Sequence, residues 1–259
     1  MKKVFLANTG IEVSCVGFGT VKFGRNEGVK YPESFELPNE NQMTGLLDLA
    51  QELGINLLDT APAYGDSEER LGKILKGRRH EWVICTKAGE EFVNGESFYE
   101  FSKDKIRKSI ERSLQRLKTD YLDIVLIHSN GEDEKIIKED HVFETLADMK
   151  KEGLIRAYGM STKTVAGGIL AVDQSDVVMV TYNPQSVEER PVIQHAKEKN
   201  KGIFIKKAFA SGHLVASNED AVLEALKFIF AEPGVTSVIL GTLNPWHLIH
   251  NVKCAEQVI

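Results

Sequence analysis

Four polar residues in the first half of the chain carry side chains that could together reduce a carbonyl group: Asp59, Tyr64, Lys87 and His128. A carboxylate keeps a buried lysine charged, and a charged lysine favours the deprotonated form of a nearby phenol. We therefore expect Lys87 to lower the pKa of Tyr64 by about one to three units. The phenol would then donate a proton to the carbonyl oxygen while the imidazole orients that oxygen. No metal is needed, but hydride must come from a cofactor, because no side chain supplies it.

The elements that would position these residues alternate along the chain. Short apolar runs rich in β-forming residues are separated by longer segments with helical periodicity. One such segment carries Ile106, Ile110, Leu114 and Leu117, and another, at 221–230, is stopped by Pro233-Gly234. Strands that are apolar on both faces indicate a parallel sheet covered by helices. The eight predicted strands are 15–19, 55–58, 82–85, 121–127, 155–160, 177–182, 202–205 and 235–240.

Eight strand–helix units in 259 residues fill one α/β barrel and leave no room for a second domain. We predict a single (β/α)8 TIM barrel over residues 1–259, preceded by a short β-hairpin that turns at Asn8-Thr9-Gly10. A doubly wound open sheet is the alternative. That fold normally carries a glycine-rich fingerprint after its first strand, and Gly17-Phe18-Gly19-Thr20 lacks the third glycine. The barrel is favoured.

Polar residues gather where the predicted strands end. Asp59, Lys87 and His128 follow the second, third and fourth strands, and Ser161 follows the fifth. Barrel enzymes build their sites at this carboxyl end. Taken singly, each residue has a simpler explanation as a turn former, a solvated rim charge or a core histidine. These explanations are independent of one another, so their coincidence at one face of the barrel favours a shared site.

Composition excludes several other classes of protein. The chain is 42% hydrophobic and 27% charged with a net charge of −6, which gives no electrostatic reason to expect nucleic acid or an anionic membrane as partner. Three scattered cysteines predict neither a disulfide framework nor a zinc site. The sequence shows neither an apolar signal core nor a run of about 18 apolar residues. We expect a cytoplasmic monomer that acts on a small molecule.

The residues around the four polar side chains resemble the aldo-keto reductases. The segment 54–68, which contains Asp59-Thr60-Ala61 and Tyr64-Gly65-Asp66, is similar to the first signature of that family. Lys87 and His128 match its other two catalytic blocks, and the resemblance runs from Val13 to about Asn251. It implies a barrel, a nicotinamide cofactor extended across the barrel mouth, and reduction of an aldehyde or ketone. The implied catalytic residues are Asp59, Tyr64, Lys87 and His128.

The same resemblance implies a set of cofactor contacts. Ser161 matches the residue that holds the carboxamide, but Thr162 replaces the usual Asn and Met179 the usual Gln of strand six. Phe209 could stack on the nicotinamide or could equally pack under its own loop. Lys206 or Lys207 could add charge for the pyrophosphate. The implied cofactor-binding residues are Thr20, Val21, Asp59, Ser161, Thr162, Phe209, Ser211, Gly212, Gly241, Thr242, His247 and Asn251.

The nucleotide and the substrate are less clearly indicated. NADP-selective members of the family carry Lys-Ser after strand eight and an Arg on the next helix, where this chain has Gly241-Thr242 and His247. Family habit favours NADP, with NAD as the alternative. Val21 stands where Trp is common, and little chain follows the last predicted helix, so we expect an open pocket for small aldehydes, ketones or sugars.

Two other functions remain as alternatives. The first is a non-catalytic subunit of the same fold that binds nicotinamide and senses redox state. The altered carboxamide residues favour it mildly, whereas the intact catalytic set opposes it. The second is a barrel hydrolase or aldolase in which Lys87 forms a Schiff base. That chemistry requires a lowered lysine pKa, and Asp59 should raise it.

Overall fold

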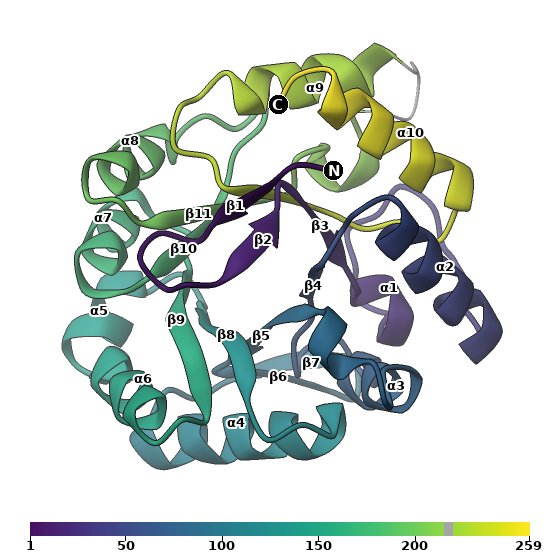
Figure 1. The fold of residues 1–259 in the computed structure, drawn as a ribbon. Coiled ribbons are helices and arrows are strands. Elements are labelled where there is room, and N and C mark those ends of the chain that lie inside the picture. The colour runs from purple at the N-terminus through teal and green to yellow at the C-terminus, as the bar shows by residue number, and fades with distance from the viewer. Residues whose placement is uncertain (215–219) are drawn as a thin grey trace.

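Eight parallel strands form a closed barrel surrounded by helices in the computed structural model, which describes residues 1–214 and 220–259 (Figure 1). The strand order around the barrel is β10-β11-β12-β3-β4-β5-β8-β9. This confirms the predicted (β/α)8 barrel, and each predicted strand is present to within a few residues. The barrel strands are β3 (Val16–Gly19), β4 (Leu57–Asp59), β5 (Val83–Ala88), β8 (Leu122–His128), β9 (Ile155–Ser161), β10 (Val177–Thr181), β11 (Gly202–Lys206) and β12 (Ser237–Leu240).

The helices pack an apolar stripe against the outside of the barrel. In the helix that follows the third barrel strand, Ile106, Ile110 and Leu117 are buried, as their spacing predicts. None of the helices in the described part of the chain combines the length and apolar character needed to span a bilayer. The helices are α1 (Val21–Gly24), α2 (Glu40–Glu52), α3 (Ser67–Ile74), α4 (Lys103–Leu117), α5 (Asp133–Lys138), α6 (Val142–Lys151), α7 (Val165–Gln174), α8 (Arg190–Glu198), α9 (Asp220–Phe230) and α10 (Pro245–Glu256), with 3-10 turns η1 (Arg79–Glu81) and η2 (Ala210–Gly212).

The predicted N-terminal hairpin closes one end of the barrel. Strands β1 (Lys3–Phe5) and β2 (Glu12–Ser14) pair antiparallel and lie across the centre of the ring in Figure 1. Leu6, Ile11 and Val13 pack into the apolar interior of the barrel with residues that begin strands, among them Leu57 and Val177. The hairpin therefore seals the amino-terminal end and leaves the carboxyl end for the site.

A second hairpin, which the sequence analysis missed, stands at the carboxyl end. It consists of β6 (Glu90–Val93) and β7 (Glu96–Tyr99), directly after β5. Asn94 and Gly95 form its turn with φ of 53° and 85°. Asn-Gly is the pair that a two-residue hairpin turn with positive φ at both positions favours. The hairpin places new side chains beside the residues at the ends of β5 and β8.

Replacing Leu6 by alanine tests the sealing role of the first hairpin. Leu6 is fully buried, so we expect the free energy of unfolding to fall by roughly 2–5 kcal/mol in urea titrations followed by circular dichroism. Phe5→Ala is the matched control, because the neighbouring Phe5 is 66% exposed, and it should change stability by no more than about 0.5 kcal/mol. Equal losses of unfolding free energy in the two variants would contradict the sealing role of the first hairpin.

Candidate active site

The strand ends bring the four predicted catalytic residues to one place. Asp59 is the last residue of β4 and His128 the last residue of β8, while Lys87 lies one residue before the end of β5. In the barrel β4 pairs with β5 and β5 with β8, so these three residues come from consecutive strands. Tyr64 lies on the loop between β4 and α3. The mouth of the barrel thus gathers residues that are up to 69 positions apart in the sequence.

Asp59 and Lys87 form a buried ion pair at the centre of this group. The Lys87 Nζ donates to Asp59 Oδ1 at 2.6 Å and to the Thr60 carbonyl oxygen at 2.9 Å. Their side chains are 5% and 1% exposed. Burial alone would lower the pKa of Lys87, but the Asp59 carboxylate outweighs burial, with help from Tyr64, and the pKa lies above its ordinary value. Lys87 is therefore a fixed cation, which opposes a role as a Schiff-base nucleophile.

Tyr64 lies against this pair, but the predicted direction of its pKa shift is wrong. Its hydroxyl donates to Asp59 Oδ2 at 3.4 Å, and the Lys87 Nζ lies 4.7 Å from the centre of its ring. Burial and then the Asp59 carboxylate raise the pKa of Tyr64, and the opposing influence of Lys87 is smaller. The shift is upward because Asp59 offsets the field of Lys87 at the phenol and because the phenol itself is desolvated.

His128 faces Tyr64 on one side and a glutamate from the second hairpin on the other. The Tyr64 and His128 rings are 6.3 Å apart and nearly perpendicular. The His128 Nδ1 lies 2.7 Å from Glu90 Oε2, although the N–H direction is poorly aligned with that oxygen. Burial lowers the pKa of His128 and Glu90 opposes this shift. At neutral pH the imidazole is therefore mostly uncharged, with its Nδ1 edge turned towards a carboxylate.

Glu90 itself is held as an anion. It is 7% exposed, and its Oε1 accepts a hydrogen bond from the Ser97 hydroxyl at 2.7 Å. Burial opposes ionisation, but hydrogen bonding and charge interaction with His128, together with the Ser97 and Tyr99 hydroxyls, outweigh burial and lower the pKa of Glu90 to about 2. The sequence analysis did not identify this residue. The Asn94-Gly95 turn was the signal that could have placed it beside the mouth.

A second residue that the sequence analysis missed is Tyr31, on the segment between α1 and α2. Burial and the charge of Asp59 raise its pKa, so its phenol lies within electrostatic range of Asp59. The Lys22 Nζ lies 4.2 Å from the centre of the Tyr31 ring. Nearby, the Arg25 guanidinium stacks 3.4 Å from the centre of the Phe92 ring on the second hairpin. The segment 25–39 has no periodicity that would have placed these residues at the rim.

The residues predicted to hold the carboxamide lie at the end of β9. Ser161 and Thr162 are buried. The Ser161 hydroxyl accepts a hydrogen bond from Lys206 at 2.8 Å, and the Thr162 hydroxyl donates to Glu189 Oε1 at 3.0 Å. Met179, in place of the usual Gln, packs into the apolar interior of the barrel. Among the described residues no acceptor takes the hydrogen of the Ser161 hydroxyl, whereas that of Thr162 is already used.

The other predicted cofactor residues lie on the segments that follow β3, β11 and β12 in the chain. Thr20 is fully buried, and its hydroxyl bonds to the Asp59 carbonyl oxygen and to Ser67, each at 2.9 Å. Val21 begins α1, and Phe209, which is partly buried, packs against the apolar core; its stacking on the nicotinamide stays a prediction. Ser211 and Gly212 form η2 with positive φ. Four further residues lie after β12 and in α10. Thr242 and Asn251 are buried, and Gly241 and His247 are exposed.

Lysines from three segments give the mouth a positive rim. Burial lowers the pKa of Lys207, and the charges of Lys30 and Lys163 lower it further, so these three ammonium groups lie within electrostatic range of one another. All three side chains are exposed. This cluster of cations fits the pyrophosphate of a dinucleotide, and the Ser161 hydroxyl fits its carboxamide. The residues present are thus compatible with a nicotinamide cofactor.

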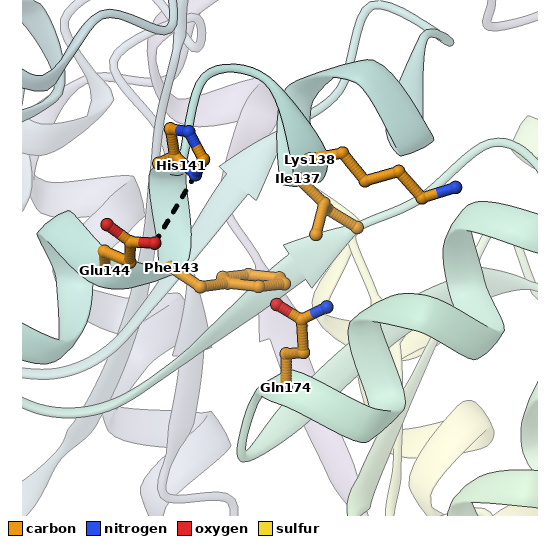
Figure 2. Close-up of a pocket in the computed structure, with 6 residues that line it drawn as sticks. All are labelled: Ile137, Lys138, His141, Phe143, Glu144 and Gln174. Carbon is orange, nitrogen blue, oxygen red and sulfur yellow. Dashed lines mark ion pairs between the residues drawn. The ribbon is translucent and has the colours of Figure 1, made fainter.

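A surface hollow of about 230 Å³ lies away from this mouth, on the outer layer of helices (Figure 2). Its walls come from α5, α6, α7 and the turn between α5 and α6, where His141 pairs with Glu144 at 3.4 Å. It contains none of the residues predicted from the sequence. The strand ends, and not this hollow, carry the groups that suit carbonyl chemistry.

Comparison with known proteins identifies the class to which this fold and site belong. The sequence model described as Aldo/keto reductase family matches residues 15–223. The chain belongs to this family, so it is an oxidoreductase of a class that reduces carbonyl groups and uses nicotinamide cofactors.

Individual relatives agree with this assignment. The structure of the PA4992 protein of Pseudomonas aeruginosa, named as an aldo-keto reductase, superposes with a TM-score of 0.91 at 49% identity, over 99% of this chain and 94% of that one. The oxidoreductase YqkF of Bacillus subtilis is 27% identical over 99% of this chain and 92% of its own length. The NADH-specific methylglyoxal reductase of Escherichia coli is 33% identical over 61% of this chain and 51% of its own length.

Replacing Glu90 by glutamine tests its electrostatic contact with His128. Because Glu90 raises the pKa of His128 against the effect of burial, we expect its removal to lower that pKa further, as measured by NMR titration of the imidazole. Glu91→Gln is the matched control, since Glu91 pairs with Arg112 of α4 instead. An unchanged or higher His128 pKa in Glu90→Gln would show that the carboxylate does not act on the imidazole.

Proposed function

We propose that this protein reduces an aldehyde or ketone to an alcohol, with hydride from a nicotinamide cofactor and a proton from Tyr64. The observation that carries the proposal is the position of Asp59, whose two carboxylate oxygens contact the Lys87 ammonium and the Tyr64 hydroxyl. This contact fixes a cation and a phenol side by side at the mouth of the barrel. The cofactor, when bound, supplies the hydride that the side chains cannot.

Tyr64 acts as the general acid. Its raised pKa keeps the hydroxyl protonated at neutral pH, so the proton is present when it is needed. Reduction turns the carbonyl oxygen into an alkoxide, which is a far stronger base than a phenolate, so proton transfer from Tyr64 is favourable despite the raised pKa. The Lys87 ammonium then stabilises the phenolate that is left behind. Asp59 keeps that ammonium in place.

His128 orients the carbonyl oxygen. Its Nδ1 faces Glu90, which leaves Nε2 for the substrate. Nε2 donates a hydrogen bond as the Nε2–H tautomer of the uncharged ring, and also when the ring carries both protons, a state that the Glu90 carboxylate stabilises against burial. This arrangement fixes the oxygen near the Tyr64 hydroxyl and helps to balance its developing negative charge. The contacts among all four side chains favour catalysis over a non-catalytic sensing role.

The cofactor we propose is NADP, with NAD as the alternative. The proposal rests on the habit of the family and on the positive rim formed by Lys30, Lys163 and Lys207. His247 at the start of α10 is the candidate partner for a 2′-phosphate. Gly241-Thr242 lacks the charged partner that NADP-selective relatives carry, and one relative is named as NADH-specific. The preference between the two nucleotides is therefore a quantity to measure.

Substituting Tyr64 by phenylalanine removes the proposed acid together with its hydrogen bond to Asp59. We expect kcat with a reactive aldehyde to fall by roughly 10²–10⁴-fold, while the affinity for the reduced cofactor, measured by fluorescence titration, stays within about threefold. Tyr158→Phe is the control, because Tyr158 packs against Phe143 outside the barrel. If Tyr64→Phe keeps most of its activity, another group donates the proton.

Thermal unfolding in the presence of each nucleotide tests cofactor binding directly. A ligand that binds the folded state alone, at about 100 times its Kd, stabilises the protein by roughly 2.7 kcal/mol. We expect the melting temperature to rise with NADPH and to rise less with NADH at the same concentration. No shift with either nucleotide would exclude the proposed function, and a larger shift with NADH would reverse the proposed preference.

A further inference from the structure

Lys206 is a lysine in the barrel mouth that the proposed mechanism does not use. It is the last residue of β11, and it is partly buried. Its Nζ donates to the Ser161 hydroxyl at 2.8 Å and to the Thr162 carbonyl oxygen at 2.6 Å, both at the end of β9. Since β10 lies between β9 and β11, the side chain reaches across one whole strand. It ends beside the residues that fit the cofactor carboxamide.

The environment of Lys206 differs from that of Lys87. Lys87 touches the Asp59 carboxylate, which neutralises its charge within the site. Both hydrogen-bond partners of Lys206 are neutral oxygens, and within the described residues no carboxylate lies at ion-pair distance from its nitrogen. Glu189 is the anion that acts on it from further away, and its oxygens are already bonded to the Thr162 hydroxyl and the Thr181 amide. The charge of Lys206 is therefore only partly compensated.

Several charged groups surround Lys206 at longer range. Burial lowers the pKa of Lys206 to about 8, and the charges of Lys207 and Lys163 contribute to this lowering. Glu189, at the start of α8, and Asp133 of α5 act in the opposite direction and raise the pKa. Lys206 in turn lowers the pKa of His128 at the end of β8. The charge of Lys206 therefore acts on a residue of the proposed catalytic set. An ammonium also has three N–H donors, and two of these are used in the bonds to Ser161 and Thr162, which leaves one for a group that enters the mouth.

We propose that Lys206 makes this protein bind the reduced nicotinamide cofactor more tightly than the oxidised one. The inference rests on the proposed function, because it requires that the nicotinamide lie beside Ser161. The nicotinamide ring is neutral in NAD(P)H and positively charged in NAD(P)⁺. An uncompensated ammonium beside the ring repels the oxidised form and leaves the reduced form unaffected, while its free N–H serves the carboxamide of both.

This discrimination has a functional consequence for carbonyl reduction. The oxidised cofactor is a product of that reaction and competes with the reduced cofactor for the free enzyme. Weakening its binding keeps the site available to NAD(P)H when both forms are present. Lys206 is thus a positioning and selecting residue that acts on cofactor exchange, whereas Tyr64 acts on the proton.

The test is the ratio of two dissociation constants, Kd for NADP⁺ divided by Kd for NADPH, measured at pH 7 by calorimetry or fluorescence titration; the NAD⁺ and NADH pair is measured in the same way. Two unit charges held several ångströms apart in a partly buried site change an affinity by on the order of tenfold or more. We therefore expect Lys206→Met to lower this ratio by at least about tenfold, mainly through tighter binding of the oxidised form. Lys197→Met, which removes an exposed cation near the end of α8 and outside the proposed cofactor contacts, should leave the ratio unchanged.

The dependence on pH supplies a second readout. Lys206 is charged below a pH of about 8 and neutral above it, so the wild-type ratio should fall as the pH rises from 6.5 to 9.5. Lys206→Arg keeps the charge at every pH in this range, and its ratio should stay constant. Circular dichroism and the binding of NADPH establish that each variant is folded.

The outcomes separate the two proposals. If neither form of either nucleotide binds the wild-type protein, the proposed function fails. If both forms bind but the ratio in Lys206→Met equals that of the wild type, or changes as much in Lys197→Met, then the role of Lys206 is overturned while the proposed function stands. A wild-type ratio that does not change with pH would also contradict the inference.

Discussion

The site depends on one buried ion pair, between Asp59 and Lys87. Removing two charges from water is costly, and their attraction offsets this cost only when the geometry is close and the remaining hydrogen-bonding groups are satisfied. Here the Thr60 carbonyl oxygen accepts a second hydrogen bond from the ammonium, and the Tyr64 hydroxyl donates a hydrogen bond to the second oxygen of the carboxylate. The ion pair therefore fixes the positions of its own two charges and of the Tyr64 phenol beside them.

The barrel supplies the rigidity that this pair requires. Asp59 and Lys87 sit on adjacent strands whose backbone register is set by apolar residues buried on both faces. The loop after β4 brings Tyr64 back over the pair, and β8 delivers His128 opposite. The second hairpin then places Glu90 behind His128. The strands thus hold Asp59, Lys87 and His128, while the loop after β4 contributes Tyr64 and the second hairpin contributes Glu90.

Much of this arrangement could be predicted from the sequence, because parallel barrel strands leave a plain signal. They appear as short apolar runs, and a polar residue at the end of such a run points to the mouth. That reasoning located Asp59, Lys87, His128 and Ser161 on their strands. It could not give the pKa of Tyr64, whose direction depends on how far burial and Asp59 outweigh Lys87 in three dimensions.

Other features escaped prediction for a different reason. Glu90 is informative only once the hairpin of residues 90–99 is recognised, and its contact with His128 joins two separate elements. Lys206 is predicted from the sequence only as a cation for the pyrophosphate, and its bonds to Ser161 and Thr162, which cross an intervening strand, are not predicted. Such contacts depend on the path of a long side chain, which local composition does not encode.

Leu6, Ile11 and Val13, which fill the amino-terminal end of the barrel, limit the directions from which small molecules can reach the site. With the amino-terminal end filled and the interior packed by side chains, small molecules can approach Asp59, Lys87 and His128 only from the carboxyl-terminal end. A cofactor and a carbonyl compound would therefore share one route of entry and exit.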